Sequence, residues 1–178
     1  MMKMVKRKLP LILIIIGLSF MLTSAAYAWF AGAVNHPGEA PLPEQLAGNR
    51  MVSSIEGEAA IAEMENLHGK EFPLVSGAIG RYGAEGQGTL WVSGAPFKLM
   101  ATRMVSSMRD KIAQGRSPFT PIGEQKNGKR TIYELEGLGQ SHFYFQSGSL
   151  LIWLAVDANQ AEQALAEVLE FYPSSGGP

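Results

Sequence analysis

His142-Phe-Tyr-Phe-Gln-Ser-Gly-Ser-Leu-Leu-Ile-Trp-Leu-Ala-Val-Asp157 is the stretch that decides the fold of this chain. Two runs rich in aromatic and aliphatic residues, 142–146 and 150–156, flank a Ser-Gly turn, and this pattern predicts a β-hairpin. Apolar residues then recur at helical spacing, with Asp157 at the expected N-cap and Gln160 at the capping-box position. The stretch therefore predicts a hairpin that leads directly into a C-terminal helix.

Further strands and helices are expected upstream of this hairpin. An Asn-Gly pair at 127–128 separates two strand-like runs, which is the strongest short-range hairpin signal in the chain. Before it, a glycine-rich loop at 83–88 joins two more such runs. The expected elements are, in chain order, strands at 50–55, 72–82, 89–93, 119–125 and 130–136, with helices at 58–68 and 96–115 between them.

The order of these elements predicts an α+β domain. Its first six elements follow β-α-β-β-α-β, the split ferredoxin-like order, so we expect an antiparallel sheet with helices on one face. Gly88-Thr-Leu-Trp-Val92 and Leu151-Ile-Trp-Leu-Ala155 also resemble each other, and each precedes a helix. Either the domain is a pseudo-repeat of residues 46–115 and 116–172, or two apolar strand-helix units look alike by chance.

The first 34 residues indicate a membrane-targeting segment. Four basic residues between Lys3 and Lys8 precede an uncharged run from Leu9 to Val34, which is the pattern of a secretory signal. As a helix this run would span roughly 39 Å, more than a ~30 Å hydrocarbon layer.

Two fates of this segment stay open, besides a buried N-terminal helix. Ala26 and Ala28 are small residues at the positions that a signal peptidase reads, which favours a cleaved signal peptide. The continuation of the run through Trp29 and Phe30 favours a signal anchor with its aromatic pair near the outer interface. Either fate places the rest of the chain outside the cytoplasm, in a periplasm or at a cell surface.

The remainder of the chain is expected to have three parts. Residues 35–45 contain three prolines and a glycine, and this composition predicts an extended linker. Residues 46–172 should form a single extracytoplasmic domain. Residues 173–178 predict a disordered tail.

Composition excludes several classes of function. The chain has 15 basic and 16 acidic residues, so removing the four basic residues of the leader leaves 11 against 16, a net charge of −5. Because phosphate contacts need a basic surface, we expect no nucleic-acid partner. The chain has no cysteine, which removes disulfides, thiolate metal sites and cysteine nucleophiles.

The sequence carries no recognisable catalytic set. It has no Gly-x-Ser-x-Gly elbow for a Ser-His-acid triad, and the glycine loop at 83–88 joins two strands, whereas a phosphate-binding loop leads into a helix. We therefore predict no catalytic residue and no cofactor. An enzyme is the third functional hypothesis, with Arg81, Tyr82 and Glu85 beside the glycine loop as its polar cluster.

Two sets of residues could bind a metal. His68 and His142 could meet across a helix-sheet interface and hold a metal or haem iron. Met100, Met104 and Met108 share one helical face, and thioethers suit Cu(I). Methionine is also a common core residue on such a face. A copper or haem carrier is therefore the alternative hypothesis.

The leading hypothesis is a non-enzymatic binding or accessory domain. Alternation along the 142–146 strand sends Phe143 and Phe145 to one sheet face and His142, Tyr144 and Gln146 to the other. Together with Tyr133, the second set is the candidate surface for a ligand or partner, since amphipathic aromatic side chains favour recognition sites. The expected partners are the membrane, through the leader, and a protein or a small apolar ligand.

Overall fold

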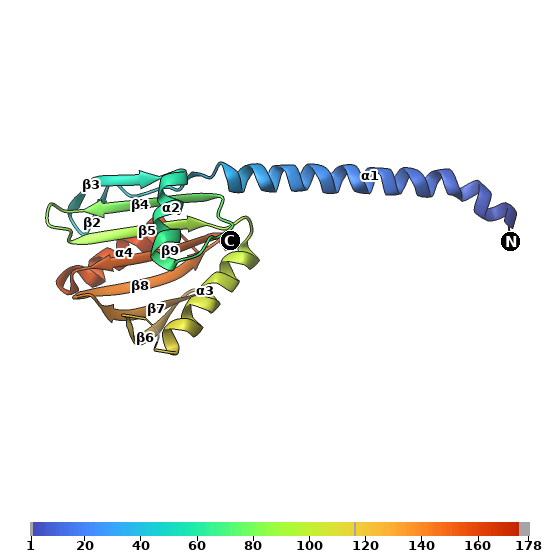
Figure 1. Cartoon of the computed structure of the whole chain (residues 1–178). Coiled ribbons are helices and arrows are strands. Elements are labelled where there is room, and N and C mark those ends of the chain that lie inside the picture. The colour runs from blue at the N-terminus through green and yellow to red at the C-terminus, as the bar shows by residue number, and fades with distance from the viewer. Residues whose placement is uncertain (1, 116, 175–178) are drawn as a thin grey trace. The chain divides into compact units, whose positions relative to one another are not determined.

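The computed structural model describes residues 2–115 and 117–174, with side chains from residue 8 onward (Figure 1). The chain divides into two compact units, Met1–Asn35 and His36–Pro178. The first is an apolar helix and the second is an α+β domain with a nine-stranded, mainly antiparallel sheet. The predicted fold class is thus confirmed at this level.

Helix α1 covers Met2–Asn35, the described residues of the first unit. Its stretch Lys8–Asn35 is long and apolar enough to cross a membrane, judged by length and composition. Secretory signals near an N-terminus share this property, so the helix is compatible with a signal peptide as well as with a signal anchor.

The strands of the domain pair in the spatial order β2-β3-β4-β5-β9-β8-β7-β6, and β1 pairs with β4 in parallel. Most of these strands match the expected ones to within a few residues at each end. The strands are β1 (Gly38–Glu39), β2 (Gln45–Leu46), β3 (Asn49–Glu56), β4 (Ser76–Tyr82), β5 (Gly88–Gly94), β6 (Thr120–Asn127), β7 (Arg130–Gly137), β8 (Gln140–Ser147) and β9 (Leu150–Val156).

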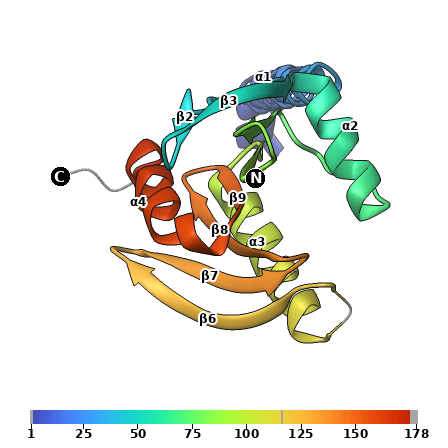
Figure 2. The same cartoon turned by 90° about the vertical axis from the view of Figure 1, so that its left-hand side faces the viewer.

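The helices of the domain lie on both faces of the sheet, so the expectation of one covered face was wrong. They are α2 (Gly57–His68), α3 (Lys98–Ala113) and α4 (Ala161–Phe171). Helix α4 packs with Leu90 and Leu154, whereas α2 and α3 pack with Trp91 and Trp153. Neighbouring residues of a strand point to opposite faces. We call these the α4 face and the α2/α3 face; Figure 2 shows the sheet curving around α4.

The ferredoxin-like arrangement is not confirmed. Strands β3, β4 and β5 are successive neighbours, and β6 lies at the far edge of the sheet. The resemblance of the two tryptophan strands does have a spatial counterpart, because Trp91 of β5 and Trp153 of β9 are register partners at the centre of the sheet. The helices that follow these strands, α3 and α4, nevertheless pack on opposite faces.

The segment expected to be a linker packs onto the domain. Residues 38–39 and 45–46 are strands of the sheet, and Ala40 between them is buried. The Tyr82 hydroxyl donates to the Pro43 carbonyl at 2.9 Å, and the Tyr172 hydroxyl donates to the Pro41 carbonyl. The carbonyls of this proline-rich segment thus accept hydrogen bonds from two buried tyrosines.

The start of the C-terminal helix differs from the expected capping box. A single 3₁₀ turn, Ala158–Gln160, follows Asp157, and no side-chain cap is formed there. The Asp157 carboxylate instead accepts a hydrogen bond from Gln140, and the Gln160 side chain accepts one from Asn49. Tertiary partners have thus replaced the local capping pattern. Of the expected tail, residues 175–178 lie outside the described residues.

The domain has its own apolar core. Its three clusters draw all their buried residues from positions 40–172. The cluster around α4 is the largest, and it joins strands from both halves of the sheet. The domain of residues 36–178 therefore does not need the leader to complete its core.

Candidate ligand-binding site

A row of aromatic side chains crosses the α2/α3 face. Register pairing aligns Tyr133 of β7, Tyr144 of β8, Trp153 of β9 and Trp91 of β5 on successive strands. The rings of Tyr133 and Tyr144 stack with centroids 4.7 Å apart, and those of Tyr144 and Trp153 with centroids 5.3 Å apart. Adjacent aromatic residues at paired positions thus form a continuous stack across three strands.

His142 is fixed at the edge of this stack. Trp153 donates from Nε1 to His142 Nδ1 at 3.1 Å, and His142 Nε2 lies 3.0 Å from the Gly137 carbonyl. Because an indole only donates and a carbonyl only accepts, the imidazole must be neutral with its proton on Nε2. Burial lowers the pKa of His142, against a smaller opposing effect of the Gly137 hydrogen bond. The side chain is 3% exposed.

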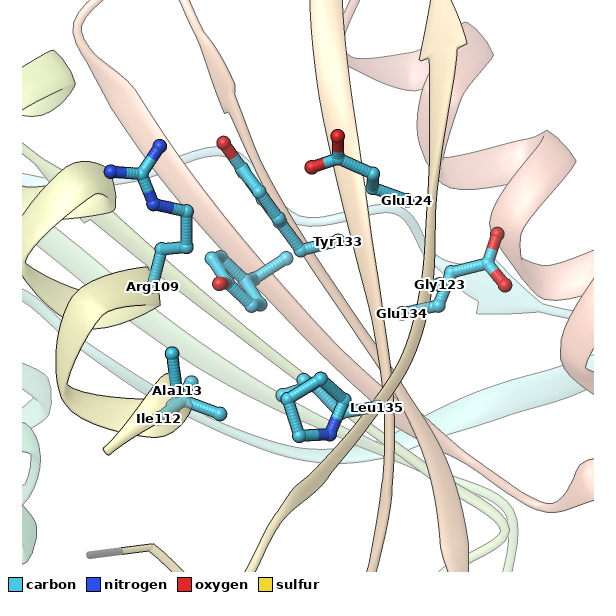
Figure 3. Close-up of a pocket in the computed structure, with 10 residues that line it drawn as sticks. Arg109, Ile112, Ala113, Gly123, Glu124, Tyr133, Glu134 and Leu135 are labelled. Carbon is cyan, nitrogen blue, oxygen red and sulfur yellow. The ribbon is translucent and has the colours of Figure 1, made fainter. Parts of the chain in front are cut away.

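A first cavity of about 260 Å³ lies between α3 and the β6–β7 hairpin (Figure 3). The rings of Tyr133 and Tyr144 line it, and its other walls are mostly apolar. Figure 3 shows Arg109 reaching from α3 toward Tyr133, with Glu124 on the far side of that ring and Glu134 turned away. The remaining lining residues are Ile112, Ala113, Pro121, Gly123 and Leu135.

The rim of the first cavity carries more carboxylates than basic groups. The Arg109 guanidinium pairs with Asp110 at 2.7 Å, and both side chains are largely exposed. Asp110, and secondarily Tyr133, raise the pKa of Arg109. Burial raises the pKa of Tyr144, with Tyr133 as a smaller cause, so the Tyr144 hydroxyl stays protonated and available as a donor. With one arginine against Asp110 and Glu124, the rim does not select for anions.

A second cavity of about 220 Å³ lies on the other side of Tyr133. It is lined by the first turns of α3 and by the turns that follow β6 and β8, and its character is polar and basic. Gln146 donates to the carbonyls of Lys98 and Gly148 and accepts from the Thr102 hydroxyl. Its basic lining residues are Lys98, Lys129 and Arg130.

The predicted surface residues separate into two cavities and a buried position. Tyr133 borders both cavities, Tyr144 lines the first and Gln146 lines the second. His142 lines neither, because Phe119 and Trp153 pack against it. Sequence reasoning did not find Arg109, the polar side chain of α3 at the first cavity. Its position next to the methionine stripe was the available signal, since the flank of an amphipathic helix borders whatever lies beneath it.

The predicted metal ligands are not gathered into one site. His68 lies at the exposed end of α2 with Nδ1 at 2.7 Å from the Met64 carbonyl and its ring against Phe72, while His142 lies among Phe119 and Trp153. Met104 and Met108 pack against the core beneath α3, and Met100 is half-buried. Within residues 2–115 and 117–174, no group of three His, Asp or Glu side chains is arranged to hold a metal.

The three residues of the polar cluster considered for an enzyme do not lie together. Arg81 pairs with Glu63 of α2 at 3.1 Å, whereas Tyr82 is fully buried on the α4 face and bonded to Pro43. Burial raises the pKa of Tyr82. Glu85 is exposed in the loop. Alternation along β4 explains the divergence, since Arg81 and Tyr82 point to opposite faces.

Comparisons with protein-family models, curated proteins and solved structures gave no match to this chain. The roles of its residues therefore rest on the geometry of the chain itself.

Proposed function

We propose that this chain is an exported, membrane-tethered binding domain, without catalytic activity, that holds a small apolar ligand in the first cavity. The observation that carries the proposal is the cavity over Tyr133 and Tyr144, whose walls are apolar and whose polar atoms are few. Ligand sites of this kind combine an apolar lining with a small number of polar groups that orient the ligand.

The first cavity is open to solvent, and its volume sets how much of a ligand it can enclose. An apolar protein cavity of about 150 Å³ accommodates benzene, so about 260 Å³ has room for one ring with a substituent or for a short branched chain. The tyrosine rings favour a flat ligand face. The Tyr144 hydroxyl and the Arg109 guanidinium would orient a hydrogen-bond acceptor on the ligand.

The alternative, a copper or haem carrier, has weaker support. His142 would have to give up one of its two hydrogen bonds to bind a metal. Met104 and Met108 would have to leave the core contacts that they make beneath α3. His68 alone keeps an accessible ring, and a single imidazole does not make a strong site.

Binding of a neutral fluorophore tests the proposal. 4-Dimethylaminobenzonitrile, a single-ring dye whose fluorescence depends on the polarity around it, should gain fluorescence with the purified domain, residues 36–178. Ala113 is exposed and lines the cavity, so Ala113→Trp should fill it and abolish the gain. Ala62→Trp, at an exposed position of α2, is the matched control and should bind as the unaltered domain does. Equal binding by both variants would show that the probe sits elsewhere.

The tether is tested separately by the intact mass of the protein from its native membrane. A chain that keeps residues 1–28 would support the anchor. A mass that lacks these residues would show cleavage after Ala28, and the protein would then be secreted and not tethered.

A further inference from the structure

One end of the domain brings together its first residues, the start of α3 and the end of α4. The Gly38 amide donates to the Val75 carbonyl, and Val75 in turn donates to Gly94 at 2.8 Å. Ala95 next donates to Ser149 at 2.9 Å. The Ser147 hydroxyl donates to Pro173 at 2.6 Å. We call this surface the tether end; it comprises residues 36–38, 75–76, 94–99, 126–130, 147–150 and 171–174.

Large apolar side chains are exposed at the tether end. Phe97 is 52% exposed, Leu99 is 62% exposed, and Phe171 is 43% exposed. Phe97 and Leu99 flank the first residue of α3, and Phe171 is the last residue of α4. They therefore belong to helices on opposite faces of the sheet, and both helices have these residues at the same end of it.

Lysines gather near the start of α3. Lys98 and Lys129 line the second cavity, which has no carboxylate among its lining residues. Lys126 bonds to the Thr131 hydroxyl beside them. Among the described residues the ion pairs are Arg81–Glu63 and Arg109–Asp110, so these three lysines have no carboxylate partner there.

The acidic residues near this end lie beside other elements. Glu39, Glu56 and Glu58 belong to β1, β3 and the first turn of α2, and Glu170 belongs to α4. The basic side chains instead come from α3 and the β6–β7 turn. The domain thus has a net negative charge but a local basic surface next to exposed Phe97 and Leu99.

We propose that the tether end is a membrane-contact surface that rests on an anionic lipid bilayer. Aromatic and aliphatic side chains beside lysines are the composition of interfacial anchors: the apolar groups enter the headgroup boundary and the lysines meet lipid phosphates. Each lysine near an anionic surface strengthens binding about 5-fold. The attraction acts within about 10 Å, the Debye length, so carboxylates elsewhere in the domain do not cancel it, whereas Glu39 and Glu170, which adjoin residues 38 and 171 of the tether end, weaken it.

The length of the chain supports the same partner. Only His36 and Pro37 separate Asn35, the last residue of α1, from Gly38 of β1. Three consecutive Cα–Cα steps span at most about 11 Å. If α1 stays in the membrane, as the proposed function holds, Gly38 cannot be far from its surface. The contact would then be intramolecular, so that even a weak affinity suffices.

Flotation of the domain, residues 36–178, with vesicles tests the proposal without the leader. Vesicles with phosphatidylglycerol should carry the domain to the top of the gradient, and vesicles of phosphatidylcholine alone should carry less of it. The net charge of −5 predicts the opposite order, which makes the comparison decisive. Recovery of the domain in the bottom fraction with both vesicle types would overturn the proposal, whatever the ligand cavity binds.

Substitutions locate the contact. Phe97→Asp should abolish flotation, and Lys98→Gln should weaken binding to the anionic vesicles about 5-fold. Leu138→Asp is the matched control, because Leu138 is 76% exposed at the β7–β8 turn, the opposite end of these strands. An equal loss in Leu138→Asp and Phe97→Asp would refute a contact at the tether end.

The full chain offers a second measurement because it has no cysteine. A fluorophore on a single introduced cysteine, Leu99→Cys or Leu138→Cys, reports its depth in reconstituted vesicles through quenching by spin-labelled lipids. Strong quenching at position 99 with little at position 138 is expected. Equal quenching at the two positions would contradict the proposal.

Discussion

The two faces of the sheet are built from the same strands but hold different side chains. On the α4 face, Leu90, Ile152 and Leu154 pack with α4 in a cluster that is mainly aliphatic. On the α2/α3 face, tyrosines and tryptophans at the neighbouring strand positions pack beneath two helices. Both cavities described above border α3, on this second face.

The comparison shows how a polar group on a buried side chain affects packing. Aliphatic side chains fill space without needing partners, so the α4 face can be closed completely. A buried tyrosine, tryptophan or histidine usually finds a partner for its O–H or N–H, which constrains its direction. On the α4 face Tyr82 and Tyr172 use proline carbonyls, and on the α2/α3 face Trp153 uses His142. The α4 face is therefore expected to supply stability and the α2/α3 face to supply the ligand-binding surface.

The largest loss of stability is expected from a substitution on the α4 face. Leu154→Ala should lower the free energy of unfolding of the domain by about 2 to 5 kcal/mol, because it opens a cavity in the closed cluster. Urea unfolding measures it. A loss under about 1 kcal/mol would mean that the α4 face is not the closed core described here.

The two tryptophans should respond differently to the same change. Trp153→Phe leaves the buried His142 Nδ1 without its donor and should cost about 1 to 3 kcal/mol. Trp91 has its Nε1 buried without an acceptor among the described residues, so Trp91→Phe removes an unsatisfied donor and should be nearly neutral. Urea unfolding of both variants under one condition checks the difference. Equal losses would remove the role assigned to the His142 hydrogen bond.

A substitution at the end of the aromatic stack should lower the free energy of unfolding by less. Tyr133 is half-buried and makes one stacking contact, with Tyr144, so Tyr133→Leu should cost about 0.5 to 1.5 kcal/mol. The same variant should change fluorophore binding in the first cavity, since Tyr133 forms one of its walls. A variant that unfolds like the unaltered domain and binds the probe equally would show that the stack ends at Tyr144.

The smallest effect near neutral pH concerns His142. Its pKa is lowered in the folded domain, so the unfolded chain binds the proton first as pH falls below about 6.5, the ordinary value. Stability is thus fully present above that pH and decreases as the pH falls from there toward the lower folded pKa. Urea unfolding at pH 7.5 and pH 5 should show this decrease, and His142→Phe should show a smaller one. If His142→Phe lost as much stability between pH 7.5 and pH 5 as the unaltered domain, the pH dependence would belong to other groups.

Several features of the fold could be predicted from the sequence, and the reasons for the misses are specific. Strand and helix positions followed from alternation and helical spacing. The second buried face did have a signal: the run from Leu150 to Val156 is apolar at every position, which is typical of a strand covered on both sides. Strand order could not be predicted, because the β5–β9 pairing depends on contacts between distant segments and not on local pattern.

The candidate site was predicted in part for similar reasons. Tyr133, Tyr144 and Gln146 do line cavities, since alternation correctly separated them from Phe145. His142 shared their face but became enclosed when Phe119 packed over it, a tertiary contact. The basic surface at the tether end could not be predicted from net charge. A value of −5 for the domain does not say that Lys98 and Lys129 lie close together.

The β5–β9 pairing also constrains when the sheet can be completed during synthesis of the chain. Strands β1 to β5 form one half of the sheet and β6 to β9 form the other. Among the described strands, the pairing that joins the halves is β5 with β9. The hydrogen bonds between β5 and β9 can form only after residues 150–156 have left the ribosome. Contacts so distant in sequence form late in folding. The two halves of the sheet therefore join only after β9, the last of the described strands, has been made.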